Sequence, residues 1–266
     1  MNIFLCGQRS FGAAVLDELL VRGHNIVGVS PAPRGEKKDK LEVTAIRKRV
    51  PVISDGEKLS FLDIPEGTDL IVAAHAHWII SSRALARARL GGVGFHPSLL
   101  PLHRGRDAVR WAVHMGDRVT GGSVYWLSDK CDGGDIILQR PVFILPDETY
   151  HELWNRLFPV GVKMLCDAVD SIEAGTATAT PQDERCATWE PSFDRQRLMR
   201  NDLYRVAAQS VKRIRCAECR YYGNDDDGYN CLCLLHTTKS QKVYVGDDDT
   251  CGDGERASTK AKLGND

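Results

Sequence analysis

The sequence lacks two features that would point to a membrane or a nucleic acid. No apolar run approaches the ~20 residues that a membrane-spanning helix needs. Charge of one sign is not in excess either, since 35 lysines and arginines stand against 36 aspartates and glutamates. We therefore expect no membrane association, and the overall charge does not favour a polyanionic partner.

The sequence also has no visible internal repeat, and its first residues lack the pattern of a secretory signal. The segment MNIFLCGQRSFG is a short apolar run that breaks at Gly7, with neither a charged lead nor a small-residue cleavage site. The length of 266 residues is enough for one large domain and a smaller one. These features predict a cytoplasmic protein.

Cysteine, in contrast, is abundant and unevenly distributed. Four of the nine cysteines are scattered over the first 190 residues: Cys6, Cys131, Cys166 and Cys186. The other five all lie between residues 216 and 251. In a reducing compartment such a cluster favours a metal site over disulfides.

Predicted strands and helices alternate through the first 195 residues or so. Continuous apolar runs at 2–6, 25–30 and 69–74 predict buried strands, with a further short strand at 51–54. The segments between them have helical spacing, and the helix expected over 81–90 has serine available as its N-cap. The pattern predicts an α/β domain with a mainly parallel, Rossmann-like sheet over 1–195.

The second half of this domain has a different pattern. Residues 120–128 and 135–145 alternate in polarity and predict two adjacent antiparallel strands. Thr149 and Glu152 have the spacing of a capping box at the start of a long helix, which Pro159 would kink.

Two loops of this domain carry residues suited to acid–base chemistry. In GFHPSLLPLHRG (94–105) His96 follows an apolar run, and in DKCDGG (129–134) Asp132 lies between two predicted strands. Ligands of such sheets bind beyond the carboxyl ends of the strands, where a carboxylate can orient and charge an imidazole. Spacing alone does not show that the two residues meet. His96 can instead be a loop histidine that only forms hydrogen bonds, and Asp132 can be part of an ordinary Asp-Gly turn. GQRSFG (7–12) predicts an ordinary strand-to-helix turn rather than a phosphate loop.

Three segments in this order resemble the folate-dependent formyltransferases: HPSLLPLHRG, AVRWAVHMGD and TGGSVYWLSDKCDGGDIILQ. This family includes the glycinamide ribonucleotide, methionyl-tRNA and amino-sugar formyltransferases. The resemblance covers about residues 1–190 and includes QDERCATWEP near the end. It implies the formyltransferase fold and an enzyme that moves a formyl group from N10 of 10-formyltetrahydrofolate to a primary amine.

The family's catalytic set is an asparagine, a histidine two residues later and a distal aspartate. The resemblance places the histidine at His96 and the aspartate at Asp132, but the asparagine position is occupied by Gly94. It implies that His96 polarises the formyl oxygen, while Asp132 holds and charges His96 and relays protons. Glycine lacks the amide that would donate a second hydrogen bond to the oxyanion, a loss that typically costs ~10²–10³ in rate.

Three explanations of Gly94 are open. Another donor can take the place of the amide: the Gly94 backbone, a water, or a side chain such as His75, His77 or Lys130. The reaction can have shifted to hydrolysis of 10-formyltetrahydrofolate. The domain can also bind folate and recruit a partner without turnover. We expect the first.

The resemblance also implies where the folate binds and what shapes the acceptor side. The pterin would lie against the ends of two strands, largely through backbone groups of Trp78, Ile79, Ile80, Ser128, Lys130 and Cys131. Gly105 would set backbone geometry. Arg104 would either support the acceptor side of the pocket or pair with an acid.

The cysteine-rich segment over 214–254 predicts a small zinc-ribbon-like module that binds structural Zn²⁺. The expected ligands are Cys216, Cys219, Cys233 and Cys251, with Cys231 as the rival of Cys233 and His236 as a further candidate. The alternatives are a loose tail with free thiols and a redox CxxC. Residues 196–213 form a basic linker, which permits a phosphate-bearing partner, although the aspartates of the ribbon weaken that interpretation. Residues 255–266 are polar and predicted to be disordered.

The amine acceptor is not specified by any motif. An amino sugar or its nucleotide is the preferred acceptor, because the chain has no counterpart of the tRNA-binding barrel of methionyl-tRNA formyltransferases. A methionyl-tRNA-like acceptor, a modified nucleic-acid base and a purine precursor are alternatives, and the oligomeric state is open.

Overall fold

The computed structural model of the chain describes residues 1–33, 38–53, 59–190 and 192–193, together with four short strands further on. The chain divides into two units, Met1–Glu190 and Pro191–Asp266. Among the described residues, no helix combines the length and apolar character needed to cross a bilayer.

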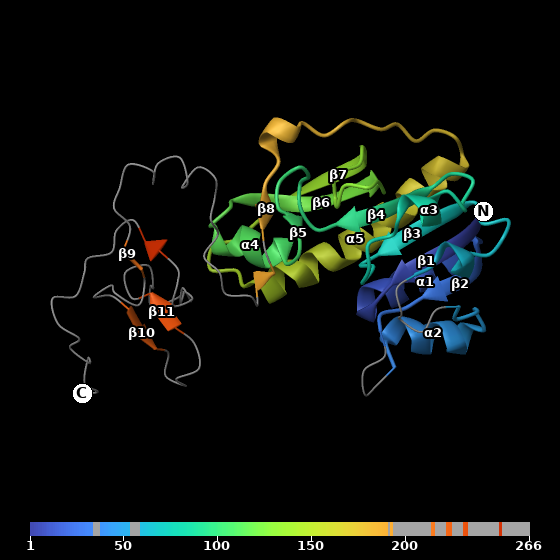
Figure 1. The fold of residues 1–266 in the computed structure, drawn as a ribbon, viewed down its shortest axis with the longest axis horizontal. Coiled ribbons are helices and arrows are strands. Elements are labelled where there is room, and N and C mark those ends of the chain that lie inside the picture. The colour runs from blue at the N-terminus through green and yellow to red at the C-terminus, as the bar shows by residue number, and fades with distance from the viewer. Residues whose placement is uncertain are drawn as a thin grey trace. The chain divides into compact units, whose positions relative to one another are not determined.

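The first unit is built on one six-stranded sheet (Figure 1). Its strands are β1 (Asn2–Gly7), β2 (Asn25–Ser30), β3 (Leu70–Ala74), β4 (Gly92–His96), β6 (Val119–Trp126) and β7 (Ile136–Phe143). They follow the spatial order β2-β1-β3-β4-β6-β7. The first four are parallel, and β6 and β7 add an antiparallel extension. The predicted α/β class, the mainly parallel sheet and the antiparallel pair are confirmed.

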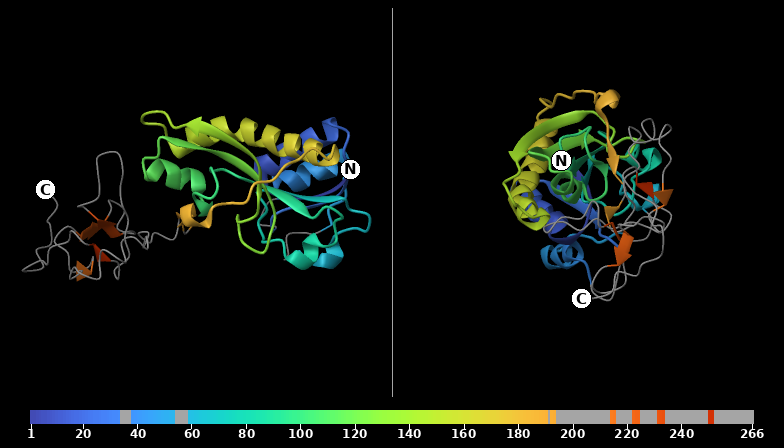
Figure 2. Two further views of the ribbon diagram at one scale, coloured as in Figure 1. Left: turned by 90° about the horizontal axis from the view of Figure 1, so that it is seen from above. Right: turned by 90° about the vertical axis from the view of Figure 1, so that its left-hand side faces the viewer.

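Helices cover both faces of this sheet (Figures 1 and 2). They are α1 (Arg9–Val21), α2 (Lys40–Lys48), α3 (Ser82–Leu85), α4 (Ala108–His114) and α5 (Tyr150–Glu173), with the single 3₁₀ turns η1 (Phe61–Asp63) and η2 (Glu184–Cys186). One apolar core joins α1 and α5 to the sheet, and it includes Leu16, Val72, Phe95 and Val169. A second core on the other face joins Phe4 and Ile71 to α3.

Two sequence-based expectations are corrected. The helix expected over 81–90 is only the four residues Ser82–Leu85, although Ser81 caps it as expected. The strand expected over 51–54 is reduced to an isolated bridge between Val29 and Val52.

The long helix α5 begins as the sequence predicts. Thr149 Oγ1 accepts a hydrogen bond from the Glu152 backbone at 3.3 Å, and Glu152 Oε2 accepts one from the Thr149 backbone at 2.8 Å. This reciprocal capping box satisfies two amides that the first turn leaves without helical partners. The helix continues through Pro159 to Glu173.

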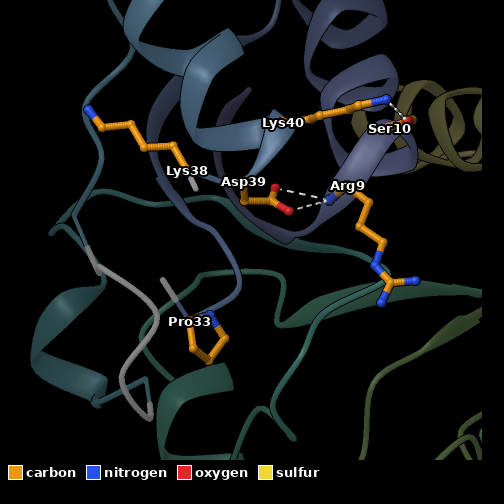
Figure 3. Close-up of a pocket in the computed structure, with 6 residues that line it drawn as sticks. All are labelled: Arg9, Ser10, Pro33, Lys38, Asp39 and Lys40. Atoms are coloured by element: carbon orange, nitrogen blue, oxygen red, sulfur yellow. Dashed lines mark hydrogen bonds between the residues drawn. The ribbon is translucent and has the colours of Figure 1, made fainter. Parts of the chain in front are cut away.

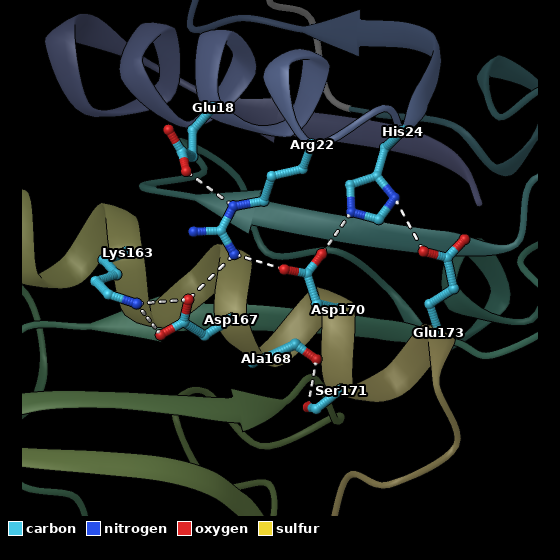
Figure 4. Close-up of polar contacts among 9 residues, drawn as sticks. All are labelled: Glu18, Arg22, His24, Lys163, Asp167, Ala168, Asp170, Ser171 and Glu173. Carbon is cyan, nitrogen blue, oxygen red and sulfur yellow. Dashed lines mark hydrogen bonds and ion pairs between the residues drawn. The ribbon is translucent and has the colours of Figure 1, made fainter.

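A charged cluster fastens the end of α1 to α5 (Figure 4). The Arg22 guanidinium contacts Glu18 at 2.8 Å, Asp167 at 3.1 Å and Asp170 at 2.6 Å. The buried His24 ring contacts Asp170 through Nε2 at 2.9 Å. Arg22 therefore links the two helices that cover one face of the sheet.

The second unit is described only as two short antiparallel pairs. Strand β9 (Ile214–Arg215) pairs with β12 (Thr250–Cys251), and β10 (Tyr222–Asn224) pairs with β11 (Cys231–Cys233). The predicted linker 196–213, the predicted tail 255–266, Cys216, Cys219 and His236 lie outside the described residues.

We expect Arg22→Ala to lower the free energy of unfolding by about 1–2 kcal/mol, because it leaves two aspartates without their shared partner. Lys163→Ala is the matched control. Lys163 pairs with Asp167 at 2.8 Å, but its side chain is 59% exposed, so its loss should change stability by less than about 0.5 kcal/mol. Urea denaturation would measure both variants, and equal effects would contradict the role of Arg22.

Candidate active site

The carboxyl end of β4 brings Gly94 and His96 to one face of the sheet. Residues two apart on a strand point to the same side, whereas Phe95 between them packs into the core. On the neighbouring strand Tyr125 pairs with Gly94, and Ser123 pairs with His96. Directly opposed residues share a face, so Tyr125 lies on the same side as His96.

His96 is buried and held by one of its ring nitrogens. Its Nε2 lies 2.6 Å from the carbonyl oxygen of His103, a bond that requires a hydrogen on Nε2. Its Nδ1 faces Asp132 Oδ2 at 3.5 Å. That separation is too long for a strong hydrogen bond, so the Nδ1 edge can still bind an oxygen or a water.

Asp132 is the centre of the site. Its Oδ1 accepts a hydrogen bond from the Tyr125 hydroxyl at 2.6 Å, and its Oδ2 accepts one from the Gly105 amide at 2.8 Å. Burial pushes the pKa of Asp132 upward, but the nearby His96 and these hydrogen bonds outweigh it, so the pKa lies below its usual range. The carboxyl group is therefore ionised at neutral pH.

The two other acidic groups next to Asp132 keep their protons. Burial, with the adjacent carboxylate as a second cause, raises the pKa of Tyr125 well above its ordinary value. The same two causes raise the pKa of the Cys131 thiol to about 12. Tyr125 is therefore a hydrogen-bond donor to Asp132, and Cys131 is not a reactive thiolate.

The loop that follows His96 is held by the last segment of the first unit, residues 180–190, which we call the strap (Figure 1). Strand β5 (Arg104–Gly105) pairs with β8 (Trp189–Glu190) in this strap. The His103 ring lies between two carboxylates, with Nε2 2.7 Å from Asp117 and Nδ1 3.1 Å from Glu190. Burial alone would lower the pKa of His103, but these two carboxylates raise it overall.

Arg104 pairs with an acid, which was one of the two alternatives for it. Its buried guanidinium bonds Glu184 at 2.9 Å and Gln182 at 2.7 Å. The Gln182 amide in turn donates to the carbonyl oxygens of Asp132 at 2.8 Å and Gly134 at 2.7 Å. Gly105 has a φ of +95°, a backbone geometry that favours glycine, as expected.

The residues expected to contact the pterin fall into two groups. Trp78 and Ile79 are exposed, whereas the Ile80 side chain is buried in the second core and leaves its backbone as the available part. In the other loop Ser128 and Lys130 bond to each other through side chain and backbone, and Cys131 Sγ lies 3.6 Å from Asp132. Both groups follow strands of the same sheet.

The side chains expected to replace the missing asparagine have other contacts. The His75 ring stacks on Phe11 and Trp154, with ring centroids 4.5 and 5.0 Å away. Burial and, secondarily, the charge of His96 lower the pKa of His75 to about 4. The space beside Gly94 is taken instead by Tyr125 and Leu127. Tyr125 was missed from the sequence, where it is one aromatic residue of an alternating strand.

A pocket of about 370 Å³ lies at the start of α1 (Figure 3). It is lined by Arg9, Ser10, Pro33, Lys38, Asp39 and Lys40, and so by none of the site residues above. The Asp39 carboxylate already accepts the Arg9 amide at 2.8 Å and the Leu41 amide at 2.8 Å. These contacts agree with a strand-to-helix turn at GQRSFG. In the part of the chain that the structure describes, no group of three or more His, Cys, Asp or Glu side chains could hold a metal ion.

The chain is similar in sequence to several known proteins. The family model described as "Formyl transferase" matches residues 1–169. The chain is 37% identical over 201 residues to the mitochondrial 10-formyltetrahydrofolate dehydrogenase of Mus musculus, an alignment that covers 71% of this chain but only 22% of that protein. It is 32% identical over 244 residues to the methionyl-tRNA formyltransferase of Thermotoga sp. (strain RQ2), covering 85% of this chain and 77% of that one.

Solved structures share the fold. An N-formyltransferase from Helicobacter canadensis, in complex with folinic acid and dTDP-3-aminofucose, matches with a TM-score of 0.58 at 14% identity. This match covers 94% of this chain and 97% of that one.

The raised pKa of His103 gives a testable pH dependence. Pairing of the imidazolium stabilises the fold fully below its unfolded pKa of about 6.5, and this contribution is lost as the pH rises through the higher folded pKa. We expect His103→Asn to flatten the decline in unfolding free energy on the alkaline side of about pH 6.5. Urea denaturation across this range would measure the effect, with the exposed His151→Asn as control. An unchanged decline in His103→Asn would contradict the assignment.

Proposed function

The chain belongs to the formyl transferase family, and we propose that it moves a formyl group from 10-formyltetrahydrofolate to a primary amine. The observation that carries the proposal is the pair formed by the buried His96, at the carboxyl end of β4, and the partly buried Asp132, in the loop after β6, both inside the matched region. The donor would supply the formyl carbon that the amine attacks, and the side chains would manage the resulting charge and protons.

The contacts of His96 and Asp132 suit these tasks. The His103 carbonyl accepts the Nε2 hydrogen, so the Nδ1 edge is the part of His96 that would face the formyl oxygen. Nδ1 would donate a hydrogen bond there in the doubly protonated imidazolium, the form that a neighbouring carboxylate such as Asp132 favours. The ionised Asp132 would accept the proton of the attacking amine, directly or through a water, and would return it to departing N10. Trp78, Ile79 and the backbone of residues 128–131 would bind the pterin.

For the acceptor we propose an amino sugar or its nucleotide. The support is the match to the Helicobacter canadensis N-formyltransferase, which extends over nearly the whole of this chain. Methionyl-tRNA is the alternative acceptor to test, because the Thermotoga relative is named a methionyl-tRNA formyltransferase.

Hydrolysis to formate is a second candidate, and Gly94, which departs from the family pattern, is the observation that raises it. N10 is the leaving group in both reactions, and a water can replace the amine as the nucleophile. The relative from Mus musculus is named a 10-formyltetrahydrofolate dehydrogenase, and the alignment covers only 22% of that protein. A hydrolase would release formate in the absence of any amine.

We expect Asp132→Asn to lower kcat/KM about 10²–10⁴-fold, because it removes the proton acceptor but keeps the shape of the side chain. The assay supplies 10-formyltetrahydrofolate with a panel of amino-sugar nucleotides, and it measures N-formyl product and formate by mass spectrometry. Asp135→Asn is the matched control, since Asp135 is exposed three residues away.

The outcomes separate the candidates. N-formyl product from wild type, lost in Asp132→Asn, supports transfer, whereas formate without amine supports hydrolysis. Neither product from protein that binds 5-formyltetrahydrofolate in calorimetry would mean a binding module. An unchanged rate in Asp132→Asn would contradict the role of Asp132.

We also propose that the second unit binds one structural zinc ion through Cys216, Cys219, Cys233 and Cys251. Besides the CxxC spacing, strand pairing supports this proposal. Cys251 opposes Ile214, two residues before Cys216, and Cys233 opposes Tyr222, three residues after Cys219. Each of these later cysteines therefore opposes a strand that adjoins the CxxC segment in sequence, which supports a shared metal ion.

Purified protein is expected to contain about one zinc ion per chain, and Cys216→Ser/Cys219→Ser to lose it, because thiolates supply the ligands. Elemental analysis and a chromogenic zinc assay would measure the metal. Cys186→Ser is the control, since Cys186 is an exposed free cysteine of the first unit. Zinc-free wild-type protein, prepared without chelators, would contradict the site.

A further inference from the structure

Gly94 and Tyr125 share one space on the face of the sheet that carries His96. A Cβ placed on Gly94 would lie 3.3 Å from the Tyr125 hydroxyl oxygen and 3.0 Å from a methyl carbon of Leu127. The phenol therefore occupies the place where a longer side chain at position 94 would begin. Because Gly94 has no side chain, the Tyr125 hydroxyl can occupy this space.

The chemistry of formyl transfer needs what this hydroxyl can supply. When a nucleophile adds to the formyl carbon, the carbonyl oxygen takes up negative charge, and a buried donor that is already in place stabilises it strongly. His96 can provide one donor from Nδ1 when its ring is the doubly protonated imidazolium. Glycine offers no side-chain donor, and the three side chains considered from the sequence do not fill the space beside it.

We propose that Tyr125 is a catalytic residue, whose hydroxyl donates a hydrogen bond to the developing oxyanion in place of the side chain that Gly94 lacks. This inference rests on the proposed function, but it does not depend on the identity of the nucleophile. An attacking amine and an attacking water both generate the same charge on the formyl oxygen.

The single hydroxyl hydrogen of Tyr125 can serve both Asp132 and the oxyanion, because the two needs arise in sequence. Before reaction Asp132 is a carboxylate and accepts the Tyr125 hydrogen at 2.6 Å. As the C–N bond forms, the N–H bond of the nucleophile breaks and its proton passes to Asp132. Protonated Asp132 then donates to the phenolic oxygen, and the Tyr125 hydrogen turns to the oxyanion.

The collapse of the adduct reverses these bonds. The carbonyl re-forms, the bond between the formyl carbon and N10 breaks, and the proton on Asp132 passes to N10. Tyr125 then donates again to the ionised Asp132. No oxidant or further reactant is needed, and the hydroxyl keeps its proton throughout, in agreement with its raised pKa.

The test is Tyr125→Phe, which removes one oxygen and keeps the ring. We expect kcat to fall about 10²–10³-fold on the pH plateau, with 5-formyltetrahydrofolate still bound in calorimetry. Tyr150→Phe is the matched control, because Tyr150 lies on α5 with its ring under the Arg110 guanidinium. Thermal melting of both variants would establish that they are folded.

The pH profile separates a catalytic role from a positioning role. Removing the hydroxyl also removes a hydrogen bond that lowers the pKa of Asp132, so the acid limb of kcat/KM should move to higher pH. Carboxyl ¹³C NMR of the ligand-free protein would record the same rise in the pKa of Asp132. If Tyr125 acted only by keeping Asp132 ionised, the rate would recover fully above this new pKa.

A deficit that persists on the plateau supports the proposal. A plateau rate within about threefold of wild type would overturn it, while leaving the proposed function intact. Wild-type protein that yields neither N-formyl product nor formate would overturn the proposed function and this inference together.

Discussion

The site depends on one constraint: a carboxylate that is largely removed from water must be surrounded by donors. The Asp132 side chain is 12% exposed, and an unpaired charge at such a position would cost several kcal/mol. Its partners come from separate parts of the chain: His96 on β4, Gly105 on β5 and Tyr125 on β6. Satisfying this one group therefore fixes three segments relative to each other.

The strap over 180–190 extends this constraint to the far end of the first unit. Gln182 holds the backbone of the Asp132 loop, while Arg104 holds Gln182 and Glu184. The His103 amide donates a hydrogen bond to Thr188 Oγ1 at 2.8 Å, and the His103 carbonyl accepts one from His96 Nε2. The loop that follows His96 is thus held by residues 78 to 85 positions later, so a truncation before the strap would remove support from the site.

The polar network also separates the tasks of the site residues. Asp132 has a lowered pKa and can accept a proton, whereas Tyr125 beside it has a raised pKa and can only donate a hydrogen bond. The two groups lie 2.6 Å apart and differ because one is stabilised as a charge and the other is buried as a neutral group. His75 stays neutral within an aromatic stack with Phe11 and Trp154.

The sequence by itself determined the α/β class, the antiparallel pair β6–β7, the capping box of α5 and the loops of His96 and Asp132. These features depend on local patterns: apolar runs, alternation, and side chains that bond within three residues. The family resemblance supplied the chemistry. Only the tertiary structure decided that Arg104 pairs with Glu184, that His103 lies between two carboxylates, and that Tyr125 fills the space above Gly94. Those contacts join residues far apart in sequence, and they depend on strand register and packing, which no local pattern encodes.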